Sequence, residues 1–296
     1  MSKDLIDSDI SFSLIQEGKE KKLHIVEVKG VELWNKIFER NRNYGGYLGF
    51  LCGSQGSGKT GLSATIVDRV FREYPDEMVL WGEPTGIPAQ FNKIHGDFQV
   101  MTHKDFPLEL YTIKDGSPLI KSDDFPIRTF RSPKEAITFC KSGILNVLFF
   151  HPEKLGKHWM RVLRYFKMDG SWQTVILDES EEIFPLNPKG QQWHDNVNFV
   201  NVCKELRKCR INMFFNSQQQ WDIDFRMLGK INLMFYLRGA RVSKVSPVWQ
   251  GAVSQLKPGQ CYVILDNSDY GIFRFPEYKP KSPEYILLPT GGRGTK

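Results

Sequence analysis

The chain has 296 residues, of which 41% are hydrophobic and 25% are charged, and its formal net charge is +6. This composition excludes an intrinsically disordered or fibrous chain, and the length suits one large domain or two small ones. The mild positive charge permits an acidic partner such as nucleic acid without requiring one.

The five cysteines are scattered along the chain, and no two of them form a CxxC pair. They are Cys52, Cys140, Cys203, Cys209 and Cys261. We expect free thiols in a reducing compartment rather than a disulfide framework or a zinc site. The N-terminus has no signal-peptide core, and no apolar run reaches the roughly 18 residues of a membrane span. A soluble, intracellular protein is therefore expected.

Apolar periodicity predicts strands that alternate with helices along most of the chain. The expected strands are 22–28, 47–53, 77–82, 125–130, 144–150, 172–179, 211–217, 231–239 and 260–267. The expected helices are 30–41, 60–74, 132–140, 156–166 and 193–210, with Ser132 as the N-cap of the third. Residues 83–142, rich in Pro, Gly and Asp, are otherwise hard to assign. The alternation predicts an α/β fold with a mostly parallel central sheet flanked by helices.

A glycine-rich segment matches the pattern G-x-x-x-x-G-K-[ST] without deviation, between an expected strand and an expected helix. It predicts a nucleotide-binding loop made of Gly53, Ser54, Gln55, Gly56, Ser57, Gly58, Lys59, Thr60 and Gly61. Backbone amides and the helix dipole would bind phosphate, Lys59 would reach the β- and γ-phosphates of ATP, and Thr60 would bind Mg²⁺. The strand–loop–helix context makes the alternative, a plain flexible turn, improbable.

Two adjacent acids end the apolar run at 172–177 and supply the second half of a nucleotide site. Asp178 would hold Mg²⁺, and Glu179 would polarise the attacking water, which favours hydrolysis over phosphoryl transfer. Glu181 and Glu182 are expected to be solvated residues at a helix start. Strand 144–150 lies between the two motifs in the chain. It suggests the additional-strand type of P-loop NTPase, in which Asp178 is not on the sheet neighbour of the P-loop strand.

Polar residues follow the next apolar run, where a third site group is expected. They are Asn216, Ser217 and Gln218. A side chain there can contact the γ-phosphate or its attacking water. Taken alone, the polar residues fit a simple strand-to-loop transition better than a site, but their position after the other two motifs favours Gln218.

Together with "KELRKCR", "INMFFNSQ" and "LKPGQCYV", these motifs resemble the FtsK–HerA superfamily of RecA-like, DNA-pumping ATPases over roughly residues 46–275. The resemblance implies that Gln218 is a sensor of hydrolysis. It also implies that Arg207, with Arg210 as second choice, is an arginine finger that reaches a neighbouring subunit. Without the resemblance, Arg207 and Arg210 are interpreted as solvent-exposed cations at the C-terminal end of a helix, where the helix dipole favours positive charge.

The chain departs from the bacterial chromosome translocases of the superfamily. Gln218, Gln219 and Gln220 stand where those proteins have Gln-Arg-Pro. The resemblance divides the chain into an accessory segment at 1–45, an ATPase motor domain at 46–276 and a tail at 277–296. This near-minimal size is similar to that of genome-packaging ATPases of membrane-containing double-stranded DNA viruses. It implies a location in the host cytoplasm or with the virion.

The resemblance implies a hexameric or pentameric ring with double-stranded DNA in its pore, loaded by a capsid, portal or other protein. Basic residues would then contact DNA phosphates without regard to sequence. The candidates are Lys154, Lys157, His158, Arg161, Arg164, Arg238, Arg241 and Lys244. Trp159, Trp193 and Trp221 are expected in packing or interfaces. The alternative functions are an ATP-dependent protein-assembly or secretion motor, of the filamentous-phage type that resembles zonula occludens toxin, and a protein-binding nucleotide switch.

Overall fold

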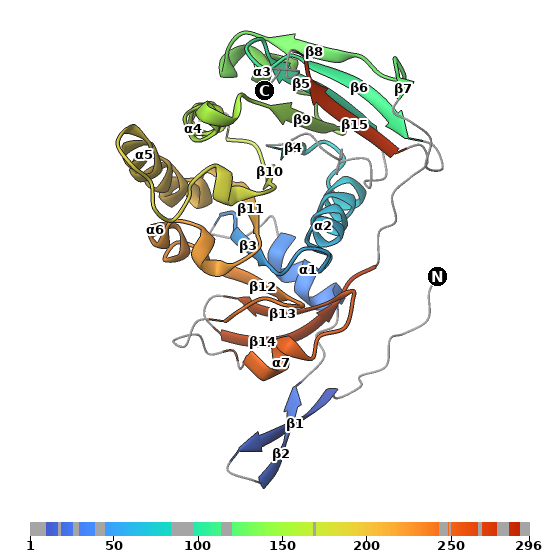
Figure 1. Ribbon diagram of the computed structural model, residues 1–296, viewed down its shortest axis with the longest axis vertical. Helices are drawn as coiled ribbons and strands as arrows, with labels where there is room; N and C mark the ends of the chain where they lie inside the picture. The colour runs from blue at the N-terminus through green and yellow to red at the C-terminus, as the bar shows by residue number, and fades with distance from the viewer. Residues whose placement is uncertain are drawn as a thin grey trace, which may run out of the picture.

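The computed structural model describes residues 10–16, 19–25, 30–38, 45–83, 97–113, 120–167, 170–242, 248, 250–265, 268–276 and 284–290. Its main element is a twisted sheet of ten strands (Figure 1). The order across this sheet is β14 (Ser268–Arg274), β13 (Gln260–Leu265), β12 (Leu233–Leu237), β3 (Leu48–Cys52), β11 (Ile211–Ser217), β10 (Gln173–Leu177), β4 (Met78–Gly82), β9 (Leu145–Phe149), β5 (Phe98–His103) and β8 (Ile127–Phe130). All neighbours from β12 to β8 pair in parallel, whereas β13 and β14 pair antiparallel, which confirms the predicted mostly parallel sheet.

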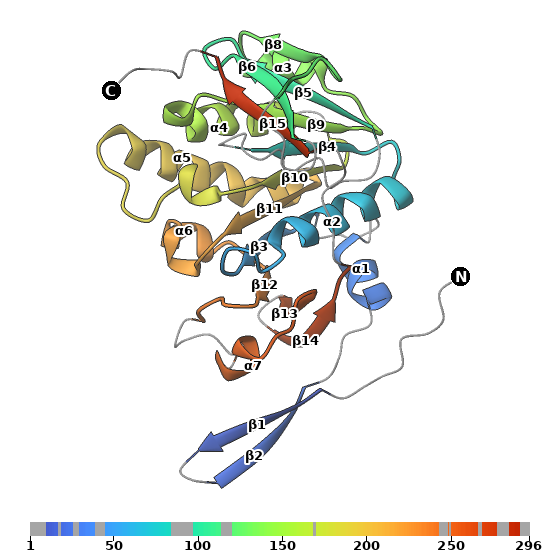
Figure 2. The ribbon, with the colours of Figure 1, turned by 45° about the vertical axis from the view of Figure 1, so that its right-hand side comes forward.

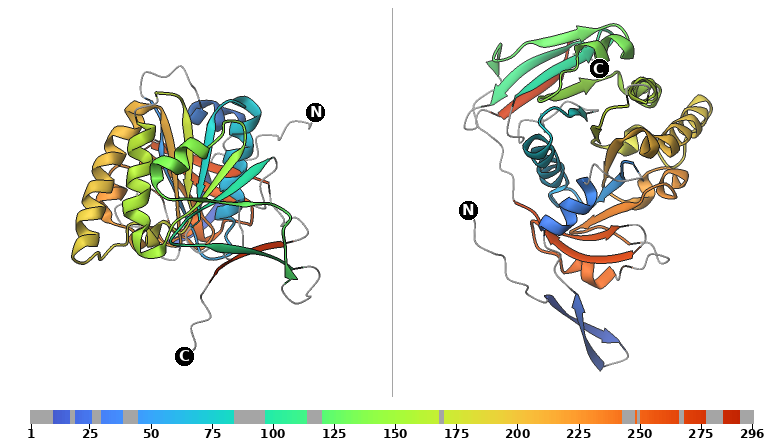
Figure 3. Two further views of the ribbon diagram at one scale, coloured as in Figure 1. Left: turned by 90° about the horizontal axis from the view of Figure 1, so that it is seen from above. Right: turned by 180° about the vertical axis from the view of Figure 1, so that it is seen from behind.

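Helices cover both faces of the sheet, as predicted (Figures 1 and 3). One face carries α3 (Pro133–Phe139), α4 (Leu155–Phe166), α5 (Gln191–Leu206), α6 (Phe225–Leu228) and α7 (Gln250–Ser254). The other face carries α1 (Gly30–Phe38) and α2 (Lys59–Glu73). Because side chains alternate along a strand, Phe50 of β3 packs with the first group and Leu51 packs with the second. Burial on both faces is why the central strands read as continuous apolar runs.

The strand order places the two halves of the nucleotide site apart, as predicted for the additional-strand type. β11 lies between β3, which leads into the P-loop, and β10, which leads into Asp178. The strand at 144–150 corresponds to β9, which lies farther out, beyond β4. The parallel pairing brings the carboxyl ends of β3, β11 and β10 to one edge of the sheet.

The expected accessory segment has two different parts. β1 (Ile10–Gln16) and β2 (Lys19–Ile25) form an antiparallel hairpin that lies beyond β14 (Figure 2). In contrast, α1 packs on the central core, where Leu33, Ile37 and Phe38 are buried and the Trp34 ring meets Phe273 edge-on at 5.1 Å. The helix therefore forms part of the same core as α2.

A small three-stranded sheet joins distant parts of the chain. β15 (Glu284–Pro289) pairs antiparallel with β6 (Leu108–Ile113), which also pairs with β7 (Ile120–Lys121). Leu287 of β15 is fully buried in the core shared with α1 and α2. The segment 277–296, expected to be a tail, thus contains a strand that returns to an insertion after β5.

The five cysteines are free thiols, of which Cys52, Cys203 and Cys261 are buried and Cys140 and Cys209 are partly buried. Across the part of the chain that the structure describes, no helix is both long and apolar enough to cross a membrane.

Candidate nucleotide-binding site

The P-loop joins β3 to α2 through backbone conformations that favour glycine. Gly56 and Gly58 have φ angles of 72° and 99°. At Gly53, an added Cβ would lie 2.5 Å from the Ser57 hydroxyl oxygen and 2.8 Å from the Leu237 Cβ. Backbone conformation therefore favours glycine at Gly56 and Gly58, and close packing excludes a side chain at Gly53. Glycine at these positions is typical of a loop whose backbone amides bind phosphate.

Neighbouring loops anchor the P-loop. The Ser54 amide and hydroxyl both donate to the Arg238 carbonyl, at 3.3 and 3.2 Å, and the Gly53 amide donates to the Ser217 carbonyl at 3.4 Å. The buried Ser57 hydroxyl oxygen has no hydrogen-bond partner among the described residues. A buried polar atom without a partner is unusual, and in this cradle it fits a site built to receive a polar ligand.

Lys59 begins α2 and lies half-buried in the cradle. Its Nζ donates to the Gly53 carbonyl at 2.6 Å and to the Ser54 carbonyl at 3.2 Å. Burial lowers the pKa of this ammonium, while the charges of Asp178 and Glu181 oppose that shift. The positive charge is thus held against the loop that would receive phosphate.

Asp178 follows β10 and is buried, at 7% exposure. Its Oδ1 accepts from the Asn216 side chain at 3.2 Å, and the same amide of Asn216 donates to the Ser63 hydroxyl at 2.9 Å. Asn216 therefore bridges α2 and β10 through the strand that separates them. Thr60 and Asp178 offer the hard oxygen donors that Mg²⁺ prefers, so the residues fit a magnesium nucleotide.

The residues after Asp178 correct one expectation. Glu179 is exposed and adopts a left-handed conformation, with φ of 44°, and Glu182 is exposed. Glu181, however, is not the solvated residue expected from the sequence. It is half-buried, and its Oε2 is buried without a hydrogen-bond partner among the described residues. Burial raises the pKa of the Glu181 carboxyl, while its own backbone amide, Ser217 and the charge of Lys59 oppose the rise.

The polar residues after β11 lie at the same edge of the sheet. Ser217 is buried, and its hydroxyl is 3.3 Å from the Gln219 carbonyl. Gln218 has an exposed side chain, and its carbonyl contacts the Cys52 Sγ at 3.7 Å. Burial raises the pKa of the Cys52 thiol to about 12, which keeps this neighbour of the site uncharged.

The arginines proposed to reach another subunit lie at the opposite edge of the sheet. Arg207 belongs to a 3₁₀ turn, Arg207–Cys209, that precedes β11, and its side chain lies outside the described residues. Arg210, with φ of 61°, donates to the Gly170 carbonyl at 3.4 Å. Since β11 runs parallel to β3, this turn is separated by the length of a strand from the P-loop of its own chain.

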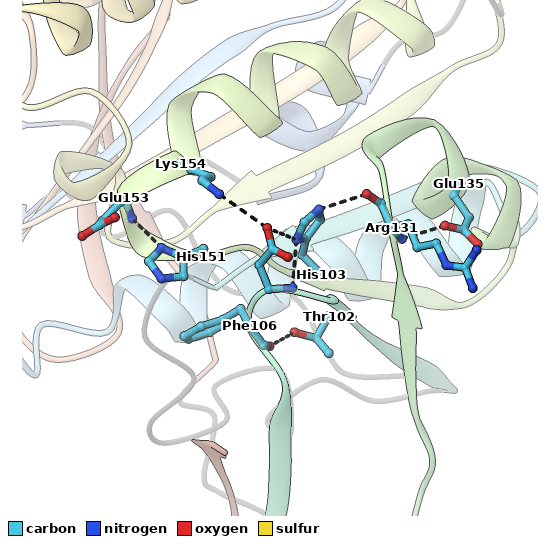
Figure 4. A network of polar contacts seen from close by, with 9 residues as sticks. Thr102, His103, Phe106, Arg131, Glu135, His151, Glu153 and Lys154 are labelled. Carbon is cyan, nitrogen blue, oxygen red and sulfur yellow. Dashed lines mark hydrogen bonds and ion pairs between the residues drawn. The ribbon is translucent and has the colours of Figure 1, made fainter. Parts of the chain in front are cut away.

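The basic residues in and directly before α4 differ in their surroundings, and Figure 4 shows one of them, Lys154. Lys157, Arg161 and Arg164 are exposed, and no described residue forms an ion pair with them; we call them the α4 cation stripe. Lys154 pairs with Asp105 at 3.4 Å. The prediction that His158 contacts DNA is wrong, because its ring is buried, at 7% exposure, and stacks on Phe150 at 5.0 Å.

The remaining candidates are placed as follows. Arg238 and Arg241 are exposed, and Lys244 lies outside the described residues. Trp159 is buried in the core at 1% exposure, whereas Trp193 and Trp221 are 46% and 40% exposed.

No family model matches the chain, and no curated protein matches it in sequence. The genome packaging NTPase B204 from Sulfolobus turreted icosahedral virus 2 with sulfate is similar in structure, with a TM-score of 0.51 and 12% identity over 80% of this chain and 100% of that chain. The AMPPCP complex of the same protein gives a TM-score of 0.50 at 12% identity, over 79% and 97%. VirB4 of Thermoanaerobacter pseudethanolicus gives 0.50 at 10% identity, over 78% and 89%. The chain therefore has an α/β, RecA-like fold like that of these structures, as the sequence resemblance implied.

Proposed function

We propose that this protein hydrolyses ATP and uses the energy to move double-stranded DNA, in genome packaging or in transfer of a mobile element. The observation on which the ATPase rests is the bridge from α2 through Asn216 to Asp178. It joins a closed phosphate cradle to a buried carboxylate two strands away. The shared fold with ATPases of the FtsK–HerA type supports the same assignment.

In this proposal each site residue has one task. Lys59 and the P-loop amides bind the phosphates, while Thr60 and Asp178 hold Mg²⁺. The metal would neutralise charge on the phosphate oxygens. Glu179 accepts a proton from the attacking water, and Gln218 contacts the water or the γ-phosphate. Glu179 is exposed at the edge of the sheet, so its carboxylate can turn towards a bound nucleotide.

Double-stranded DNA is the proposed cargo because the protein presents exposed positive charge that it does not neutralise itself. Helix α4 contains no acidic residue, and the α4 cation stripe lies along its solvent side. Its members are four and three positions apart, so they follow one face of the helix over about 10 Å. The likeness to B204, a genome packaging NTPase, agrees with this cargo.

DNA-stimulated ATP hydrolysis tests the cargo. Duplex DNA should raise the rate, and replacing all three cations of the α4 stripe by alanine should reduce the salt dependence of binding. The slope of log K against log salt should fall by about 0.9 for each phosphate that the variant no longer neutralises. The matched control is a triple alanine variant of exposed cations in α2, in α3 and in the loop before β13: Arg72, Lys134 and Lys257. Unchanged hydrolysis with DNA, or equal slopes for both triple variants, would count against DNA transport.

We propose a ring of subunits, hexameric or pentameric, in which Arg207 acts on the nucleotide of a neighbour. The position of its backbone at the edge opposite its own P-loop supports this proposal. Native mass measurement with an ATP analogue should give the ring. Mixing Arg207→Ala subunits with Glu179→Gln subunits should restore hydrolysis at mixed sites, and no recovery at any ratio would argue against an arginine finger in trans.

A protein-moving motor remains the second candidate because large aromatic side chains are exposed near the nucleotide edge. Trp193, Trp221 and Phe225 are 46%, 40% and 70% exposed. Such residues are enriched in protein interfaces and would also suit a capsid, portal or other loading protein. A rate of hydrolysis that rises with a coat or partner protein, and not with DNA, would favour this candidate.

A further inference from the structure

A second buried acid follows the strand next to the one that leads into Asp178. β4 pairs in parallel with β10, and Gly82 and Leu177 are the last residues of these strands to pair. The Asp178 amide donates to the Gly82 carbonyl at 3.0 Å, so the two chains stay side by side beyond that pair. Glu83 therefore lies next to Asp178, on neighbouring chains about 4.8 Å apart.

The alternation of side chains along β4 and β10 places both acids on the face of the sheet that carries α2. Trp81 and Ile176 are buried in the core on the side of α1 and α2. A Cβ added to Gly82 would lie 2.3 Å from the Trp159 ring of α4, on the other side of the sheet. One residue farther along, Glu83 belongs to the α2 side again.

Both carboxylates are buried at the edge of the sheet where the P-loop lies. Glu83 is 3% exposed and Asp178 is 7% exposed, whereas Glu179 is in solvent. Asp178 is connected through Asn216 to α2, the helix that begins at Lys59. Two negative charges on neighbouring chains repel each other, and a hydrated divalent cation reduces this repulsion. Mg²⁺ is commonly held by one or two carboxylates together with the phosphates of its nucleotide.

We propose that Glu83 is a second carboxylate of the nucleotide site, which acts with Asp178 to hold the hydrated Mg²⁺ of a bound nucleotide. The proposal rests on the function proposed above. Thr60 and Asp178 offer oxygen donors for the metal, but Mg²⁺ requires an octahedral set of ligands and usually keeps several waters. A buried carboxylate beside Asp178 can accept hydrogen bonds from these waters and so fix the position of the metal.

Metal binding by the full-length protein tests the role of Glu83. Mn²⁺ prefers the same oxygen ligands as Mg²⁺, and its binding to the protein–ADP complex can be measured by electron paramagnetic resonance. Glu83→Gln should bind Mn²⁺ about 10- to 100-fold more weakly, as when other groups that hold the ligands of a metal are removed. Its affinity for a fluorescent ADP analogue in EDTA should be equal or higher, because one negative charge near the phosphates is lost. A residue that only supported the fold would weaken binding in EDTA as well, and that result would overturn the proposal.

Glu77→Gln is the matched control, because Glu77 is a buried glutamate at the other end of β4. It is 5% exposed, and the Thr174 hydroxyl donates to its Oε1 at 2.6 Å. This variant should lose stability in urea and should bind Mn²⁺ as the wild type does. Unchanged Mn²⁺ affinity in Glu83→Gln, or an equal loss of affinity in both variants, would overturn the proposal.

Cleavage of the wild-type backbone by bound iron provides a second test, which does not depend on the folding of a variant. Fe²⁺ in place of Mg²⁺, with ADP, ascorbate and peroxide, cuts the chain next to the metal. Cuts near both Glu83 and Asp178 would support the proposal, and cuts near Asp178 without any near Glu83 would overturn it. A wild-type protein that binds Mn²⁺ and ADP without hydrolysing ATP would instead refute the proposed ATPase.

Discussion

Gly239 offers a sharp test of how the P-loop is held, because it lies outside the recognised motif. It occupies the turn after β12 with φ of 77°, and an added Cβ would lie 2.3 Å from the Ser54 hydroxyl oxygen and 2.8 Å from the Ser54 Cβ. Gly239→Ala must therefore push Ser54 away from the Arg238 carbonyl that anchors the loop.

Two terms set the size of the effect of Gly239→Ala. Forcing alanine into a left-handed conformation costs about 1–2 kcal/mol. Overpacking against Ser54 adds about 1–3 kcal/mol, so the free energy of unfolding should fall by roughly 2–5 kcal/mol. Gly190→Ala is the control, because Gly190 has φ of 54° and nothing within 4 Å of the added Cβ. That variant should show only the conformational term.

Urea unfolding and titration with a fluorescent ATP analogue measure the two consequences. Removing one anchoring hydrogen bond, about 0.5–1.5 kcal/mol, should weaken binding by roughly two- to tenfold in Gly239→Ala. Gly190→Ala should bind as the wild type does. If Gly239→Ala is no less stable than Gly190→Ala, or binds the analogue equally well, the close approach of Gly239 to Ser54 does not hold the P-loop.

The remaining predictions concern four single side chains. Lys59→Ala should lose both nucleotide binding and hydrolysis. Glu179→Gln should still bind ATP, but its turnover should fall by about 10²–10⁴-fold. Normal turnover in either variant would contradict the assigned roles of these residues. Asn216→Ala should cost about 1–3 kcal/mol in urea unfolding, because buried Asp178 loses a donor, and an unchanged midpoint would contradict the bridge. Burial and the nearby His103 lower the pKa of His158 from 6.5 to about 4. Between pH 6.5 and 4 the unfolded chain therefore binds more protons at this histidine than the folded protein does. As a result, the free energy of unfolding should decrease by up to about 3 kcal/mol as the pH falls across this range. His158→Phe, which keeps an aromatic ring at this position, should flatten that part of the pH profile, and an equal slope in both proteins would refute the assignment.

The central sheet could be predicted from the sequence because its strands are buried on both faces. β3, β9, β10 and β11 read as apolar runs bounded by polar residues, and the P-loop fixes the direction of β3. β15 could not be placed in the same way. Its partner β6 lies far away in sequence, and a short strand that pairs across such a distance leaves no local signal of its partner.

Helical periodicity alone could have placed His158 correctly. It lies four residues before Val162 and eight before Phe166, and both are buried. It therefore belongs to the apolar face of α4, while the α4 cation stripe follows the other face. Glu181 is a harder case, because its direction depends on the left-handed conformation of Glu179. That conformation is uncommon for glutamate, and no nearby residue signals it.

The nucleotide site is built from several loops that hold one another, rather than from the P-loop alone. Ser54 of the P-loop donates to the Arg238 carbonyl, and the Gln219 side chain accepts from the Arg241 amide at 3.2 Å. The turn after β12 is thus bonded both to the P-loop and to the segment after β11. Because Ser217 also accepts from the Gly53 amide, the three loops form a closed hydrogen-bonded unit at one edge of the sheet. A displacement of any one loop must strain the other two. Gly239, in the turn after β12, therefore belongs to the nucleotide site as much as the glycines of the P-loop do.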